Sequence, residues 1–255
     1  MERLGDGAGQ LLDDGASVLL TSADGVVVRD LDSGDDIEIA GGDGGALAVG
    51  ARILVGQGTE AVLLDPGSDD VIASAPFATG GAAPVAVGDT VLLPGSDEPT
   101  WTLVDGDAGT ATPLADLDGL TPAFSGRPER WVPFGDEAGR VLVSVDTQEG
   151  TVEPVLDLDD DERVVGLPFV AGTSAAGLVS VSDPDGTHGV LVDLAAGTTQ
   201  ELGSGLQGAS FSPDGAQIVW SDTREGTLRV APVDDVEGAE IVTDGLALPV
   251  WLNGG

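Results

Sequence analysis

The sequence predicts an all-β fold, a single six-bladed β-propeller with four-stranded blades. Three observations carry this prediction. Two ladders of short motifs repeat in step along the chain, four strand-like segments fall within each period, and no segment shows sustained helical periodicity. The 255 residues divide into six blades of about 42 residues, a length typical of propeller repeats.

The first ladder is a short apolar segment, often opened by proline, which predicts the first strand of each blade. Its copies lie 38 to 46 residues apart. This spacing leaves room for three further short strands in each period. The segments begin at Ala46, Pro84, Pro122, Pro168, Ala209 and Pro249.

The second ladder is an aspartate at the end of a hydrophobic strand, followed four residues later by glycine. An aspartate in this position accepts hydrogen bonds from backbone N–H groups of a turn, and the glycine supplies a positive φ. Each copy therefore predicts a hairpin turn, and these aspartates are expected to be structural rather than catalytic. The copies are Asp30…Gly34, Asp105…Gly109, Asp146…Gly150, Asp193…Gly197 and Asp234…Gly238, with a variant at Asp65.

The two ends of the chain predict how the ring closes. Residues 1–10 are expected to be an N-terminal tail and residues 11–255 the propeller. The first period begins with Val18-Leu19-Leu20, which matches a second strand, whereas the chain ends on Pro249-Val250-Trp251, which matches a first strand. We therefore expect the C-terminal strand to join the N-terminal blade, which would leave no open sheet edge.

A family resemblance rests on the last repeat, Phe211-Ser212-Pro213-Asp214-Gly215-Ala216-Gln217-Ile218-Val219-Trp220. Its strand, Ser-Pro-Asp-Gly turn and second strand resemble the repeat of TolB-like propellers, also called PD40 or WD40-like repeats. The other five repeats keep the ladders without this turn. The resemblance implies an extracytoplasmic binding or scaffold module, although some propellers of this kind are lids attached to enzymes.

Charge narrows the range of partners. Aspartate and glutamate number 45 against nine arginines and no lysine, which gives a formal net charge of −36. Nucleic acid is excluded as a partner because phosphate binding requires clustered basic residues. No apolar run is long enough to insert into a membrane. The negative electrostatic potential of the chain instead favours a cationic partner.

The residues that could carry chemistry are few. A single histidine and no cysteine argue against zinc or copper, so no metal site and no cofactor are predicted. Calcium is a minor alternative, at the acidic run Asp157–Glu162 or at Asp105-Gly106-Asp107, because neither matches a full calcium loop. His188 lies beside a turn without the sequence context of a catalytic triad, and no catalytic residue is assigned.

Binding is assigned to the loops that join the second and third strands of the blades, near residues 95–100, 135–139, 183–188 and 222–226. Trp101 is expected to be a partly exposed contact aromatic. The predicted binding residues are Trp101, Asp185, His188, Arg224 and Glu225.

The function expected from these observations is a non-catalytic binding or scaffold module with a protein partner at the cell envelope. Its location would be extracytoplasmic, with an anchor or signal trimmed, and a cytoplasmic location is the alternative. Two other functions stay open: a carboxylate-dependent hydrolase or lyase acting on a sugar or lactone in the central channel, and a sensor of a small ligand.

Overall fold

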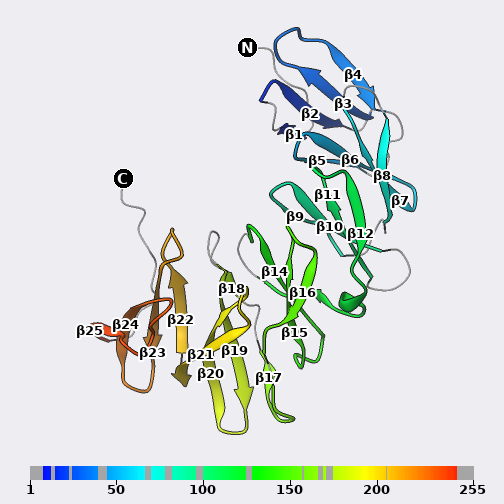
Figure 1. The fold of residues 1–255 in the computed structure, drawn as a ribbon. Coiled ribbons are helices and arrows are strands. Elements are labelled where there is room, and N and C mark those ends of the chain that lie inside the picture. The colour runs from blue at the N-terminus through cyan, green and yellow to red at the C-terminus, as the bar shows by residue number, and fades with distance from the viewer. Residues whose placement is uncertain are drawn as a thin grey trace. The chain divides into compact units, whose positions relative to one another are not determined.

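The structure is a computed structural model in which most of the chain is described (Figure 1). The described residues are 8–12, 15–22, 25–39, 45–66, 70–77, 82–95, 100–124, 128–156, 158–165, 169–170, 175–204 and 206–245.

The chain divides into two compact units. Unit 1 consists of Met1–Gly119 with Thr147–Gly150, and unit 2 consists of Leu120–Asp146 with Thr151–Gly255. In the described residues, each unit holds three antiparallel sheets, and consecutive strands are neighbours in every sheet except the fifth, where two short strands both pair with the same neighbour.

The described residues of unit 1 form the first three sheets and the short 3-10 helix η2 (Ala115–Leu117). The first sheet is β1 (Ala8–Leu11), β2 (Ser17–Ser22), β3 (Gly25–Asp30) and β4 (Asp36–Ile39). The second is β5 (Ala46–Val49), β6 (Arg52–Gln57), β7 (Glu60–Leu64) and β8 (Val71–Pro76). The third is β9 (Val85–Val87), β10 (Thr90–Pro94), β11 (Trp101–Asp105) and β12 (Thr110–Pro113).

Unit 2 contains the remaining three sheets. The fourth is β13 (Thr121–Pro122), β14 (Trp131–Gly135), β15 (Leu142–Asp146) and β16 (Thr151–Pro154). The fifth has β19 (Ala176–Asp183), β20 (Gly186–Asp193) and β21 (Thr198–Ser204). Two short strands pair with the edge of β19 opposite β20: β17 (Arg163–Val164) and β18 (Phe169–Val170). The sixth is β22 (Leu206–Phe211), β23 (Gln217–Asp222), β24 (Thr227–Pro232) and β25 (Glu240–Asp244).

The apolar middle strands of the sheets are mostly buried, and the more polar outermost strands are mostly exposed. The middle strand β6 is buried on both faces, whereas all five residues of the outermost strand β25 are exposed. Such continuous apolar runs are typical of strands covered on both sides, and polar outer strands suit an edge that faces water. The six described sheets therefore have the blade architecture that the repeats predicted.

Within each unit, neighbouring sheets pack face to face. In unit 1, Leu19 and Val28 of the first sheet share a buried cluster with Ile53 and Val62 of the second. In unit 2, Leu178 of the fifth sheet packs in a cluster with Ile218 and Trp220 of the sixth. Burying large apolar side chains between sheets stabilises these contacts by about 1.5–3 kcal/mol for each side chain.

The aspartate ladder forms the turns between third and fourth strands. The Oδ1 atom of Asp105 accepts a hydrogen bond from the N–H of Ala108 (2.8 Å), and Gly109 has a φ of 67°. Asp193 and Gly197 make the same kind of turn, with the N–H of Ala195 donating to Asp193 at 2.9 Å. These aspartates are therefore turn residues, as predicted.

In one of the predicted Asp-to-Gly turns, the sequence prediction named the wrong aspartate. In the connection between β24 and β25 the N–H of Gly238 donates to Asp235 (3.2 Å) rather than to the predicted Asp234. The strand β24 ends at Pro232, so the chain turns through a longer connection before the aspartate is used.

The N-terminal end differs from the prediction. Strand β1 begins at Ala8, within the stretch 1–10 predicted to be a tail, and its residues pair with β2 from Ala8↔Thr21 to Leu11↔Val18. The edge of β2 that was expected to receive the C-terminal strand is therefore occupied by β1. The first-strand segment near residue 249 lies outside the described residues.

The first strand of the fifth sheet is divided, which the sequence did not predict. Phe169 pairs with Leu178, near the expected position 168, but Arg163 and Val164 also pair with β19 further along. This sheet follows the longest interval of the first ladder, and the extra length supplies the acidic residues that precede β17.

No helix among the described residues has the length and apolar character needed to cross a membrane.

Candidate binding face

In each sheet of unit 2, the turn that joins the second and third strands lies at the same end of the strands. They are residues 136–141 between β14 and β15, 184–185 between β19 and β20, and 223–226 between β23 and β24. The predicted connectivity of these loops is therefore correct. The fourth predicted loop, near residues 95–100, connects β10 and β11 in unit 1. Its residues 96–99 lie outside the described residues.

Two contacts join neighbouring sheets at or beside these turns. The N–H of Val164 donates to the carbonyl of Gly139 (2.7 Å), which joins the turn after β14 to β17 of the next sheet. Gly189 of β20 lies against the side chain of Leu206, and Leu206 pairs with Asp222 across β22 and β23. We call residues 136–141, 159–165, 183–188 and 222–226 the loop face.

The turn at Asp136 is fixed by its carboxylate. Its Oδ1 atom accepts hydrogen bonds from the N–H groups of Arg140 (2.7 Å) and Val141 (2.9 Å). Partial desolvation acts to raise the pKa of Asp136, but the hydrogen bonds from Val141, Arg140 and other backbone groups outweigh it and lower this pKa below its ordinary value. The carboxylate is therefore charged at neutral pH and holds the turn.

Asp183 anchors the second turn in the same way. Its Oδ1 atom accepts from the N–H groups of Asp185 (2.7 Å) and Gly186 (2.8 Å). Its other oxygen, Oδ2, lies 3.3 Å from Nδ1 of His188. One carboxylate thus closes the hairpin and orients the imidazole of the chain's single histidine.

Glu162 approaches this pair from the preceding segment. Its Oε2 atom accepts from the N–H of Asp159 (2.9 Å), while its own N–H donates to the Asp159 carbonyl (3.0 Å). The pairing of β17 with β19 places Arg163 opposite Ser182, so Glu162 comes next to Asp183.

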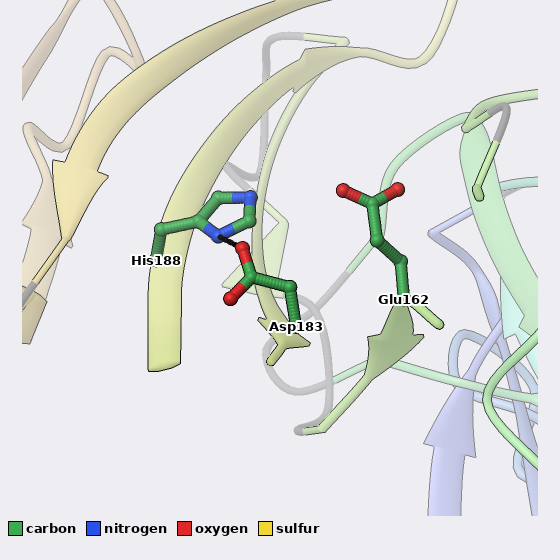
Figure 2. Close-up of side chains that lie close together, drawn as sticks. All are labelled: Glu162, Asp183 and His188. Carbon is green, nitrogen blue, oxygen red and sulfur yellow. Dashed lines mark ion pairs between the residues drawn. The ribbon is translucent and has the colours of Figure 1, made fainter. Parts of the chain in front are cut away.

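These three side chains form a half-buried cluster, which Figure 2 shows in close-up. One donor atom each from Glu162, Asp183 and His188 lie within 4.8 Å of one another. Two carboxylates and an imidazole can hold a divalent cation or a cationic side chain.

The sixth sheet contributes charged residues to the loop face. The N–H groups of Arg224 and Glu225 both donate to Asp222. Glu225 forms an ion pair with Arg229, whose Nε also lies 3.7 Å from Asp222. Arg224 is exposed at the tip of the turn.

The predicted binding residues differ in their exposure and location in the structure. Asp185 is exposed beside the cluster, and Arg224 and Glu225 are exposed on the same face. His188 is half-buried in β20 rather than in a loop. Trp101 is 2% exposed, so the prediction of a contact aromatic is wrong. Four consecutive residues of β11 from Trp101 onward are buried, because this third strand is covered on both faces.

Sequence reasoning missed Glu162 and Asp183 as neighbours of His188. Glu162 was noted only as part of an acidic run, and Asp183 only as part of a hairpin. No local spacing joins Glu162 to the other two residues, because the contact depends on the pairing of β17 with β19.

The chain resembles known proteins in its fold only. No family model and no curated protein matches the chain. The chain is similar to an oligogalacturonate lyase from Vibrio parahaemolyticus, at 14% identity over 95% of this chain and 81% of that one, with a TM-score of 0.42. It is also similar to the Cps50 (Swd1) β-propeller domain of Myceliophteria thermophila, at 13% identity over 97% and 89%, with a TM-score of 0.41. TolB from Acinetobacter baumannii is 14% identical over 89% of this chain and 51% of TolB, with a TM-score of 0.36.

Proposed function

We propose that this chain is a non-catalytic binding module that holds a protein partner at the loop face of unit 2. The observation that carries the proposal is the pair of exposed valines at the junction of the fourth and fifth sheets. Val141 is 41% exposed and Val165 is 49% exposed. The hydrogen bond between Gly139 and Val164 holds both valines on adjoining segments.

The surroundings of the valines indicate the chemistry of the partner. Exposed acidic residues flank them, with Glu137 on one side and residues 159–161 on the other. An apolar centre with a charged rim is the usual anatomy of a protein interface. The partner we propose is therefore a basic segment with an apolar side chain that packs against Val141 and Val165.

The rigid frame beneath this face also supports binding. Asp136 and Asp183 fix their turns through two backbone hydrogen bonds each. A preformed surface loses less conformational entropy when a partner binds. An extracytoplasmic position at the cell envelope is part of the same proposal, and fractionation of the native cells would test it.

The proposal predicts that a polar replacement of both valines releases the partner. We expect the double variant Val141→Ser/Val165→Ser to bind at least about tenfold more weakly, since apolar anchors at the centre of an interface contribute most of its free energy. Affinity capture from the native envelope fraction, followed by titration of the captured protein, measures the change.

A matched control exists in the same unit. Ile241 and Val242 on β25 are each 56% exposed and are not among the residues of the loop face, so the variant Ile241→Ser/Val242→Ser should bind normally. Equal binding by both double variants and the original chain would contradict the proposal. Raised salt should slow association and leave the valine dependence intact.

A further inference from the structure

We propose that Glu162, Asp183 and His188 bind one divalent first-row metal ion, with Zn²⁺ preferred over Ca²⁺ or Mg²⁺. This site goes beyond the protein-binding function and does not depend on it. The composition alone argued against a metal, since a single histidine and no cysteine are present. The fold, however, brings that histidine into contact with two carboxylates.

The donor set determines the kind of metal. Imidazole nitrogen is a good ligand for Zn²⁺ and its first-row neighbours, whereas Ca²⁺ and Mg²⁺ select oxygen. Three protein ligands from carboxylates and histidine leave at least one position open for water, which is typical of open zinc sites.

Each carboxylate is held in position by the backbone. Asp183 is fixed through Oδ1 by two turn N–H groups, which leaves Oδ2 directed at the imidazole. Glu162 is fixed through Oε2 by the N–H of Asp159, and its other oxygen has no hydrogen bond within the described part of the chain. Figure 2 shows the Asp183 carboxylate against the imidazole of His188, with the Glu162 side chain beside this pair. Asp183 and His188 are thus oriented before any ion binds, and Glu162 is held beside them.

The local charge is not neutralised by arginine. Asp36 pairs with Arg29, Asp146 pairs with Arg130, and Glu225 pairs with Arg229. Among the described residues, by contrast, no arginine pairs with Glu162 or Asp183. Two carboxylates beside one imidazole carry a local negative charge that a divalent cation would offset.

The geometry requires only a small contraction. In a tetrahedral site, donor atoms bonded to Zn²⁺ at about 2.0–2.2 Å lie about 3.3–3.6 Å apart. The present donor atoms lie within 4.8 Å of one another. A contraction of up to about 1–1.5 Å completes the site, and rotation about the side-chain torsions of Glu162 can supply it.

The test is a titration of the full chain, stripped of metal, with ZnCl₂. Sodium chloride at about 1 M, where the Debye length is about 3 Å, suppresses diffuse binding of cations to the acidic surface. We expect one equivalent of Zn²⁺ to bind, to raise the thermal midpoint, and to shift the ring ¹⁵N resonances of His188. Because the chain has one histidine, labelled imidazole gives a single assignable signal.

Variants identify the ligands. His188→Gln and Asp183→Asn should each weaken Zn²⁺ binding at least about tenfold, or about 1.4 kcal/mol. The asparagine can still accept the two turn hydrogen bonds, so the hairpin is kept. Asp193→Asn is the matched control, because Asp193 makes an equivalent turn at the other end of β20 and its loss changes the net charge equally.

Two results would overturn the site. One is weak binding of several ions with no change in the His188 resonance. The other is an equal affinity for Zn²⁺ in Asp183→Asn and Asp193→Asn at unchanged apo stability. Tighter binding of Ca²⁺ than of Zn²⁺ would refute the proposed donor chemistry.

Discussion

Replacing Trp101 with alanine should lower the free energy of unfolding of unit 1 by about 3–5 kcal/mol, the usual cost of deleting a large buried aromatic side chain. Trp101 is among the largest fully buried side chains, at 2% exposure, and opens the buried strand β11. Chemical denaturation followed by circular dichroism measures the loss.

Trp101→Phe is the control, since it keeps most of the buried apolar volume and should cost clearly less than the alanine variant. If Trp101→Ala left stability nearly unchanged and removed partner binding instead, the sequence prediction of a contact aromatic would be right. Because the chain divides into two compact units, the unfolding curve should be tested for more than one transition before a free energy is fitted.

Replacing Gly139 with alanine should destabilise unit 2 by about 2–3 kcal/mol. Gly139 has a φ of 68°, a conformation that costs an L-residue about 1–2 kcal/mol. A Cβ atom there would also lie 2.4 Å from the carbonyl oxygen of Val164. This clash would break the hydrogen bond between Val164 and Gly139, worth about 1 kcal/mol.

Gly226 provides the matched control for this prediction. It has the same φ of 68°, in the corresponding turn of the sixth sheet, but a Cβ atom there would meet nothing within 4 Å. Gly226→Ala should therefore show only the conformational cost, about 1–2 kcal/mol. Equal losses in the two variants would show that the junction at Val164 contributes nothing.

The Gly139 variant should also disturb the loop face. The junction fixes β17, and Glu162 directly precedes β17. Displacement of this segment should weaken both partner binding at the valines and Zn²⁺ binding at His188, whereas the Gly226 variant should leave Zn²⁺ binding unchanged. Titrations of the two glycine variants, run beside the denaturation experiments, separate these effects.

Local patterns were sufficient to predict much of the fold. The apolar segments, the polar outer strands and the Asp-to-Gly turns each depend on residues close in sequence, so their chemistry can be recognised without a structure. The Ser-Pro-Asp-Gly turn is an example. It joins β22 to β23, with Ser212 donating to Asp214 at 2.5 Å and Gly215 at a φ of 67°.

The sequence by itself determined the repeat, most of the strands and most of the turns, because these follow from periodicity and from backbone preferences of a few neighbouring residues. Tertiary structure alone decided that Trp101 is buried, that β1 occupies the edge of β2, and that Glu162 meets Asp183 and His188. Burial and strand pairing depend on which distant segments lie side by side, and no local motif encodes that choice.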